Sequence, residues 1–352
     1  MLELINIHKS YSGFRVEDIN LSVSPGDYFV ILGRSGAGKT LLLEMAAGIR
    51  KPDRGSILLD GMDVTFNRPQ DRNIGLVFQD QAIFPHLTVA GNIAYPLRRN
   101  GYNRREIRRR IRELAQPAGL TALLDRYPAT LSGGESQRTV LARTLASEPK
   151  VLLLDEPLSS LDVQYKRELQ SFLRTLNQQG QTIVHVTHDY EEAMALANRV
   201  AVIDQGRIRQ QGEIHQVFRN PSNSFIAEFV GIRNFFRGHV KAWPGKEHKR
   251  ARVDNEVVLA VPAATDDGEV MITLEARNII LSKNKTESSA LNNFRGTVTD
   301  VVPTRQGLEV VVDIGVELAA LITRESQQKL DIHTGSKLWI SFKASALNVS
   351  RV

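Results

Sequence analysis

A glycine-rich segment constrains the fold of this chain more than any other feature. Gly33–Thr40 matches the pattern G-x-x-x-x-G-K-[ST] and follows the apolar run Tyr28–Leu32. A strand that passes through such a loop into a helix offers backbone N–H groups and a positive helix end to bound phosphates. We expect Lys39 to reach the β- and γ-phosphates of a nucleotide, and the Thr40 hydroxyl to bind Mg²⁺. The expected phosphate-binding residues are Gly33, Arg34, Ser35, Gly36, Ala37, Gly38, Lys39 and Thr40.

Two further apolar runs end close to polar residues that suit phosphate chemistry. Val151–Leu154 leads directly into Asp155 and Glu156, and His188 follows another apolar run that starts at Thr182. A carboxylate at a strand end beside a phosphate loop can hold Mg²⁺, which we expect of Asp155. A second carboxylate can orient and deprotonate the attacking water, which we expect of Glu156. His188 is expected at the end of a neighbouring strand of the same sheet.

The spacing of the apolar runs predicts two unlike halves. Up to about residue 235, short apolar strands alternate with helical stretches, which is typical of a doubly wound parallel sheet covered on both faces. A helix-rich insertion is expected at about residues 85–145. Beyond residue 235 the chain consists of short β segments between Gly and Pro turns. We therefore expect an α/β P-loop NTPase domain over residues 1–232 and an all-β domain over residues 233–352.

The all-β half repeats itself. Phe236–Val240 is echoed by Phe294–Val298, and Ile272–Ala276 is echoed by Ile340–Ala344. The first pair of segments lies 58 residues apart and the second pair 68 residues apart. Such a repeat in a β-rich region indicates two copies of one small supersecondary unit. We expect two OB-like barrel modules in tandem, at about residues 234–284 and 291–352.

The segment Leu131–Gln137, Leu-Ser-Gly-Gly-Glu-Ser-Gln, resembles the signature loop of the nucleotide-binding subunits of ATP-binding cassette (ABC) transporters. The other motifs follow in that family's order over residues 1 to about 232. The resemblance implies that Tyr11 stacks on adenine. It implies further that Gln79 of the Q-loop takes part in catalysis and binds Mg²⁺. It also implies that His188 is the switch histidine. The expected activity is ATP hydrolysis coupled to transport, with ATP and Mg²⁺ as cofactors.

The signature loop implies a composite site. In the family, each ATP lies between the phosphate loop of one subunit and the signature loop of the other, in a head-to-tail dimer. Since one chain has one copy of each motif, a homodimer would form two equivalent sites. The residues expected to complete the site in this way are Ser132, Gly133, Gly134 and Asp162, the last residue of the D-loop Ser159–Asp162.

Two residues depart from the family's common pattern. Leu41 stands where many relatives have a hydroxyl residue, and Glu135 stands in the signature loop where Gln is common. The Glu135 side chain is not one of the expected phosphate donors, so we expect it to be tolerated. Neither departure affects Lys39, Asp155 or Glu156, and hydrolysis is still expected.

The resemblance also implies partners at a membrane. The segment Phe84–Asn92 resembles the region that docks the coupling helices of two separate permease subunits. Exposed Phe84 and Leu87 would suit that role, whereas the alternative is that both are ordinary core residues. No apolar stretch reaches the roughly 18–20 residues of a membrane span. The chain is therefore expected on the cytoplasmic side of the membrane, peripheral through its permease subunits, as in prokaryotic importers that are fed by a solute-binding protein.

The second barrel copy resembles the molybdate-binding module called TOBE. This likeness favours molybdate or tungstate as the cargo; sulfate, iron, polyamine or sugar is the alternative. Hydroxyl and ammonium groups can bind an oxyanion, and we expect such a site at Thr323, Ser326, Lys343 and Ser345. The family's Ser-Ala-Arg-Asn sequence at the start of the module is replaced by Ala290–Asn293, which lacks the hydroxyl and the arginine. The alternative hypothesis is that the barrels bind no ligand and only dimerise the subunit.

Composition and charge leave one rival class. The absence of cysteine excludes a disulfide scaffold, a thiolate metal site and a cysteine nucleophile. The net charge of +6 and the arginine run Asn103–Glu113 are compatible with a solvated helix face, anionic lipid or nucleic acid. A soluble ABC ATPase that acts on nucleic acid would need aromatic side chains among basic residues on its barrels. The barrels hold few of them, so no nucleic-acid partner is expected.

Overall fold

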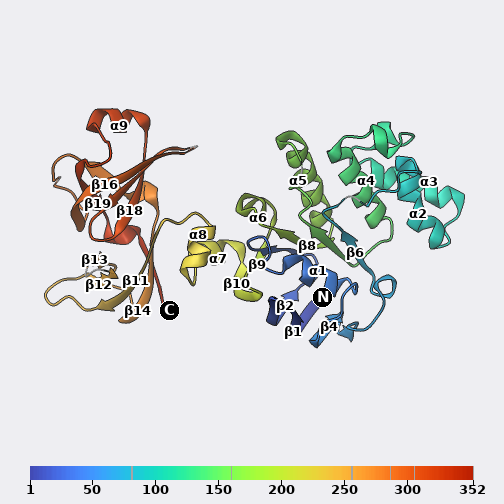
Figure 1. Cartoon of the computed structure of the whole chain (residues 1–352), viewed down its shortest axis with the longest axis horizontal. Coiled ribbons are helices and arrows are strands. Elements are labelled where there is room, and N and C mark those ends of the chain that lie inside the picture. Colours follow the sequence, from blue (N-terminus) through green and yellow to red (C-terminus); the bar gives the residue numbers. More distant parts are fainter. Residues whose placement is uncertain (81, 160, 255–256, 286, 305, 352) are drawn as a thin grey trace. The chain divides into compact units, whose positions relative to one another are not determined.

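The computed structural model describes residues 1–80, 82–159, 161–254, 257–285, 287–304 and 306–351 (Figure 1). In this part of the chain, contacts between residues define two compact units, Met1–Val217 and Phe218–Val352. The division expected between residues 232 and 233 therefore falls inside the second unit. The reason is that helix α8, Ser224–Phe229, packs against β11, Asn234–Lys241, the first strand of that unit.

The first unit is built on a mainly parallel sheet, as the sequence predicts. Strands β6, β7, β8, β3 and β9 run parallel, and β10 pairs antiparallel with β9 at one edge. Every residue of β3, β7 and β8 is buried, which a sheet covered on both faces requires. The strands are, in sheet order, β10 (Arg207–Glu213), β9 (Arg199–Asp204), β3 (Tyr28–Leu32), β8 (Thr182–Thr187), β7 (Val151–Asp155) and β6 (Ile74–Val77).

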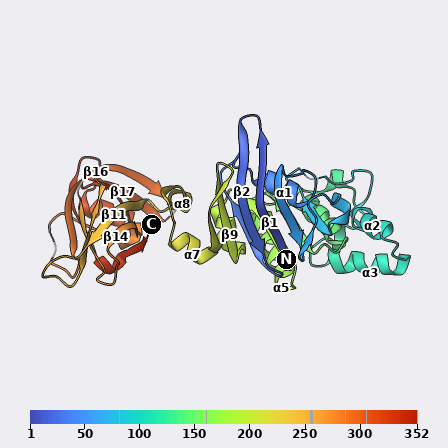
Figure 2. The ribbon, with the colours of Figure 1, turned by 90° about the horizontal axis from the view of Figure 1, so that it is seen from below.

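An antiparallel sheet packs against the same core. Its strands β1 and β2 form a long hairpin, which Figure 2 shows rising beside the rest of the unit. Buried Leu4, Ile7 and Ile19 from this sheet share one apolar cluster with Phe29 of the parallel sheet and Leu43 of helix α1. The cluster fixes the hairpin next to the phosphate loop. The strands are, in order, β2 (Phe14–Val23), β1 (Leu2–Tyr11), β4 (Arg54–Leu59) and β5 (Met62–Asp63).

The helices of the first unit include the expected insertion. Within residues 85–145, α2 packs against α3 and α4, with short 3-10 turns η2 and η3 between α3 and α4. The described helices are α1 (Lys39–Ala46), η1 (Pro69–Asp71), α2 (Val89–Arg99), α3 (Arg104–Ala115), η2 (Thr121–Leu123), η3 (Pro128–Thr130), α4 (Gly133–Leu145), α5 (Val163–Gln178), α6 (Tyr190–Leu196) and α7 (Ile214–Arg219). None of the helices in the described chain is long and apolar enough to cross a membrane.

The second unit contains the expected repeat, but its two copies exchange strands. The sheet orders are β13-β12-β11-β14-β20 and β15-β19-β16-β17-β18. The last strand of each copy thus joins the sheet of the other, after the 3-10 turns η5 (Ala276–Asn278) and η6 (Ala344–Ala346). The other elements are β12 (Lys249–Val253), β13 (Val258–Val261), β14 (Gly268–Leu274), β15 (Ile280–Ser282), β16 (Asn292–Thr304), β17 (Gly307–Asp313), β18 (Glu317–Ile322), α9 (Arg324–Leu330), β19 (Lys337–Phe342) and β20 (Leu347–Arg351).

Two buried asparagines repeat this exchange at the level of side chains. Asn234 of the first copy donates to and accepts from the backbone of Ala319 in the second copy, at 2.9 and 2.7 Å. Asn292 of the second copy does the same with Ala260 in the first copy, at 2.9 and 2.8 Å. Buried amides need such partners, and each copy supplies those of the other. The modules at 234–284 and 291–352 therefore form one interlocked unit with one apolar core.

Candidate nucleotide site

The loop between β3 and α1 has a backbone conformation that its glycines permit. Gly36 and Gly38 have φ angles of +80° and +101°, in the left-handed region that glycine adopts at low cost. A Cβ atom on Gly33 would lie 2.3 Å from the carbonyl oxygen of Ile203 in β9. Helix α1 begins at Lys39, directly after this loop. Its N-terminus therefore adds N–H groups and a positive dipole end to the loop.

Lys39 supplies the buried cation of the loop. Its Nζ donates to the carbonyl oxygens of Gly33 at 2.9 Å and Arg34 at 3.1 Å, and it lies 3.9 Å from Glu156 Oε1. Burial lowers the pKa of Lys39, although the carboxylates of Glu156 and Asp155 act in the opposite direction. Burial removes the water that would stabilise the charged ammonium. A phosphate group bound in this loop would stabilise that charge instead.

Thr40 and Asp155 form a site with the donors that Mg²⁺ prefers. Thr40 Oγ1 donates to Asp155 Oδ1 at 3.1 Å, and Asp155 is buried at the end of β7. Burial raises the pKa of Asp155, and the neighbouring Glu156 carboxylate raises it further. A divalent cation would favour the charged carboxylate. Mg²⁺ is bound through oxygen ligands from one or two protein groups, water and phosphate, and Thr40 and Asp155 offer such oxygens.

Glu156 and His188 meet at the ends of neighbouring strands. Glu156 Oε1 lies 3.2 Å from His188 Nδ1, and the Glu156 N–H donates to the Val186 carbonyl of β8 at 3.0 Å. Glu156 has a φ of +44°, which is costly for a residue with a Cβ and recurs at functional sites. Half of the His188 side chain remains exposed. The carboxylate and the imidazole can thus both reach a molecule bound in front of the sheet.

An ion-pair network behind His188 was not found by sequence reasoning. Lys166 of α5 donates to Asp189 Oδ2 at 2.8 Å and lies 2.7 Å from Glu192 Oε1 of α6. Asp189, the neighbour of His188, caps α6 by accepting from the Glu192 backbone at 3.2 Å. The network ties α5, which follows the D-loop, to the His188 loop. The spacing of Asp189 and Glu192 indicates a helix start, but nothing local points to Lys166.

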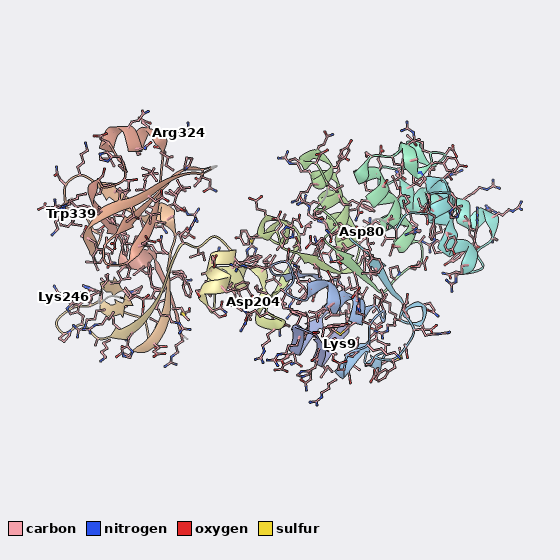
Figure 3. The ribbon with its side chains drawn as sticks, viewed as in Figure 1. Lys9, Asp80, Asp204, Lys246, Arg324 and Trp339 are labelled. Atoms are coloured by element: carbon pink, nitrogen blue, oxygen red, sulfur yellow. The ribbon has the colours of Figure 1, made fainter. Side chains whose placement is uncertain are left out.

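Two adjoining cavities follow the phosphate loop, and Tyr11, Phe14, Ser35 and Gly36 line both. One has a volume of about 580 Å³ and is also lined by Gly38, Lys39, Thr40, Leu41, Glu44, Arg50, Gln79 and Glu156. The other has a volume of about 730 Å³ and is also lined by Ser10, Gly13, Arg15, Arg34, Ala37, Asp204 and Gln205. Asp204, labelled in Figure 3, is the last residue of the parallel strand β9, and Gln205 follows it; neither was expected from the sequence.

Tyr11 lies at the open side of these cavities with its ring partly free. The side chain is 43% exposed, and its hydroxyl accepts from Arg50 Nη1 at 3.3 Å. Lys9 Nζ lies 5.6 Å from the centre of the ring. These contacts hold the ring at the end of the β1–β2 hairpin, where a planar base can stack on it.

The signature residues occupy the N-terminus of helix α4. Ser132 caps α4: its Oγ accepts from the Glu135 N–H at 3.3 Å, and Glu135 Oε2 accepts from the Ser132 N–H at 2.7 Å. Glu135 is therefore the partner of a capping box, a role that the spacing Ser-x-x-Glu would have revealed. A Cβ on Gly134 would lie 3.0 Å from Tyr165 Cβ, so α5 packs close to this helix end.

The signature residues do not line either cavity of the phosphate loop. Ser132, Gly133 and Gly134 are absent from both linings. Asp162 immediately precedes α5, is exposed, and likewise belongs to neither lining. Ser160 of the D-loop lies outside the described residues. The signature residues thus lie apart from the cavities at the phosphate loop within one chain.

The segment Phe84–Asn92 is organised by one buried amide. Asn92 Oδ1 accepts from the Phe84 N–H at 3.0 Å, and Asn92 Nδ2 lies within 3.2 Å of the carbonyl oxygens of Phe84, Leu87 and Thr88. Phe84 and Leu87 are half-buried, not part of the core. The Phe84 ring contacts Tyr95, which is 48% exposed, with 4.7 Å between ring centres. The segment is a preformed, partly apolar surface.

The four expected oxyanion residues do not form one cluster within the chain. Thr323 and Ser326 follow β18, whose last residue Ile322 pairs with Leu308, opposite Pro303 near the end of β16. Lys343 and Ser345 follow Phe342, which pairs with Asn292 at the start of β16. Because β16 spans Asn292–Thr304, the two pairs lie at opposite ends of a long strand. Thr323 and Ser326 therefore lie apart from Lys343 and Ser345 within a single chain.

Elements next to both pairs pack against the first copy of the repeat. The end of β18 packs against η5 of the first copy, and η6, which contains Ser345, packs against β13 of the first copy. Thr323 caps α9 and accepts from the Ser326 N–H at 3.1 Å. Figure 3 labels the next residue, Arg324, at the start of this helix. The two pairs thus follow different strands of one sheet, β18 and β19.

A phosphate loop with a buried lysine, a hydroxyl–carboxylate pair and a second carboxylate at the sheet edge define a P-loop nucleoside triphosphatase. The family model described as ABC transporter matches residues 16–159, and the TOBE domain model matches residues 288–349. The chain belongs to the family of ABC transporter ATP-binding proteins. The following relatives show this over nearly the full length.

Molybdate/tungstate import ATP-binding protein WtpC of Pyrococcus abyssi is 41% identical over 351 residues, which cover 99% of this chain and all of that protein. Spermidine/putrescine import ATP-binding protein PotA of Chromobacterium violaceum is 40% identical over 304 residues, which cover 85% of this chain and 84% of that protein. Among solved structures, the dimeric post-hydrolysis state of the ATP-binding cassette MJ0796 bound to ADP and Pi matches with a TM-score of 0.55 and 30% identity. That match covers 61% of this chain and 99% of the cassette.

Proposed function

We propose that the chain is the ATP-hydrolysing subunit of an importer for molybdate or tungstate, and that it acts as a homodimer. One observation carries the dimer. The phosphate loop faces cavities that the chain's own signature residues do not line, while Ser132 and the N-terminus of α4 are preformed elsewhere. A head-to-tail pair brings the two parts together twice. The dimeric cassette bound to ADP and Pi supports this arrangement.

The residues at the sheet edge divide the chemistry among them. Lys39 and the loop N–H groups bind the β- and γ-phosphates, and Tyr11 stacks on adenine. Mg²⁺, held by Thr40, Asp155 and Gln79, would supply positive charge to the phosphate oxygens. Glu156 orients the attacking water and accepts its proton. His188, 3.2 Å from Glu156, holds that carboxylate in place and contacts the γ-phosphate.

The cargo assignment rests on full-length likeness. The WtpC relatives of two Pyrococcus species match over 99% of this chain, at 41% and 38% identity. The PotA relative matches at 40% identity over 85% of it. A spermidine or putrescine importer is accordingly the second candidate. We propose that Phe84–Asn92 docks two permease subunits at the cytoplasmic side of the membrane, and that a solute-binding protein delivers the anion. Nucleic acid has no part in this function.

Uptake by the assembled importer tests the cargo. The chain is reconstituted in vesicles with its permease subunits and solute-binding protein, and entry of tungstate and spermidine is measured. We expect ATP-dependent uptake of tungstate that spermidine does not inhibit. Lys39→Ala, which removes the phosphate-binding ammonium, is the inactive control. Uptake of spermidine without uptake of tungstate would reassign the cargo to the polyamines.

A further inference from the structure

The first unit has a strongly basic helix face that plays no part in nucleotide binding. Helix α3 carries Arg104, Arg105, Arg108, Arg109 and Arg112, all of them exposed, and we call these five residues the arginine face. We propose that the arginine face binds the anionic lipid headgroups of the membrane on which the importer works. This inference rests on the proposed function in one respect, which is that the permease subunits hold the first unit at a membrane.

The five arginines lie on one side of the helix. At about 100° per residue, their positions span an arc of about 140°. Glu106 and Glu113 lie beyond one edge of this arc, and Ile107 and Ile111, which are less exposed, lie beyond the other edge. One face of the helix therefore carries positive charge only, with no acidic residue between the five arginines.

Most of the arginine face has no acidic partner. Arg109 lies 3.5 Å from Glu113, and Arg110, outside the face, pairs with Glu148. Within the described residues, the side chains of Arg104, Arg105, Arg108 and Arg112 form no ion pair. Their charge is thus available to a ligand. A helix face that serves only for solubility normally mixes both signs of charge.

Helix stability does not explain these residues. Arg104 and Arg105 occupy the first turn of α3, where cations interact unfavourably with the helix dipole. The helix begins with a complete capping box between Asn103 and Glu106, so its start is fixed without them. Their placement against the helix dipole favours a ligand whose negative charge compensates for this unfavourable interaction.

The position of the helix favours a membrane. Helix α3 packs against α2, and α2 begins at Val89 within the proposed permease-docking segment. Two more exposed arginines, Arg98 and Arg99, end α2 and lead towards the arginine face. Guanidinium groups bind phosphate oxygens through paired hydrogen bonds. The arginine face has no aromatic side chain on which a base of single-stranded nucleic acid could stack.

Vesicle binding by the full chain tests the proposal. Co-sedimentation is measured with vesicles of phosphatidylcholine alone and of an equal mixture of phosphatidylcholine and phosphatidylglycerol. The variant carries Arg104→Gln, Arg105→Gln, Arg108→Gln and Arg112→Gln. Because each basic residue contributes about fivefold to the affinity for an anionic surface, the variant should bind the mixed vesicles at least about 100-fold more weakly. High salt should release the wild type.

The matched control removes the same charge from scattered sites of the second unit: Arg237→Gln, Arg250→Gln, Arg295→Gln and Arg324→Gln. We expect it to bind mixed vesicles within about fivefold of the wild type. Equal losses in both variants would mean that net charge, and not the arginine face, attracts the chain. Failure of the wild type to prefer mixed vesicles would overturn the proposal. So would an arginine-face variant that binds vesicles normally but loses affinity for oligouridylate.

Two further readouts keep the test independent of folding and of the proposed function. Glutamine is a good helix former, so the unfolding temperature of the arginine-face variant should equal or exceed that of the wild type. Its basal ATP hydrolysis should be unchanged, since none of the substituted residues lines the nucleotide cavities. If hydrolysis were absent in the wild type, the proposed function would fail while vesicle binding still decided the present inference.

Discussion

Glu156 has a strained backbone, a place at a strand end and charged neighbours, and all three favour its proposed role as the general base. Its φ of +44° turns the side chain off the end of β7. The backbone is held there because the Glu156 carbonyl accepts from Ser159 Oγ at 2.9 Å, while its N–H donates to Val186. These hydrogen bonds thus hold an unfavourable backbone conformation. That conformation places the Glu156 carboxylate between Lys39 and His188.

Replacing that carboxylate should separate binding from hydrolysis. We expect Glu156→Gln to bind ATP at least as well as the wild type, since Lys39, Thr40 and Asp155 are untouched. Turnover should fall by about 10²–10⁴-fold, which is the usual contribution of a general base. Single-turnover hydrolysis and equilibrium nucleotide binding measure the two quantities. Glu148→Gln makes the same change at an exposed residue that lines neither nucleotide cavity, and it is the control with unchanged turnover. Near-normal turnover in Glu156→Gln would remove Glu156 from this role.

The residues of the site were accessible to sequence reasoning to different degrees. Gly33–Thr40 and the strand-end acids form local patterns, because a phosphate loop and a strand terminus are each built by neighbouring residues. Asp204, Gln205 and Lys166 reach the site only through the pairing of distant strands and helices. No local spacing encodes those contacts.

Among the elements, helix α1 depends on a buried guanidinium at its C-terminal end. Arg72 is 1% exposed, and its Nη1 donates to the carbonyl oxygens of Met45 at 2.8 Å and Ala46 at 2.9 Å. Its other nitrogens donate to Thr65 at 2.7 Å and Asn67 at 3.1 Å. One residue thus satisfies four carbonyl groups and joins the end of α1 to the turn after β5.

Loss of this guanidinium should be costly. We expect Arg72→Met to lower the free energy of unfolding by about 3 kcal/mol, because buried carbonyl groups lose charged donors. Arg68→Met is the matched control, since Arg68 is exposed and pairs only with Asp71 at 2.9 Å; it should cost less than about 1 kcal/mol. Urea denaturation measures both. Equal midpoints for the two variants would show that Arg72 does not brace α1.

The strand exchange in the second unit shows where element-level reasoning from sequence ends. The repeat Phe236–Val240 and Phe294–Val298 correctly predicts two related copies. It does not indicate that β15 and β20 change sheets, because a strand has the same alternation of side chains in either sheet. The spacing of Thr323, Ser326, Lys343 and Ser345 likewise does not indicate that they follow strands ending at opposite ends of β16.

At the scale of the whole molecule, the proposed nucleotide site depends on a second copy of the chain. The phosphate loop and the signature helix are both complete, but the cavities at the phosphate loop lack the signature residues. The sequence predicts such a composite site only through its resemblance to a family, because the geometry of a dimer leaves no local pattern in one chain. ATP held between two copies would link hydrolysis to their separation.

Complementation between two inactive variants tests this claim most directly. Lys39→Ala removes the phosphate-binding ammonium, and Ser132→Arg fills the signature loop. In a head-to-tail heterodimer both defects fall in the same site, and the other site stays intact. We predict that each variant alone is inactive and that an equal mixture recovers about a quarter of the wild-type ATP turnover, because half of the randomly formed dimers have one working site. A mixture as inactive as its components would contradict the composite site.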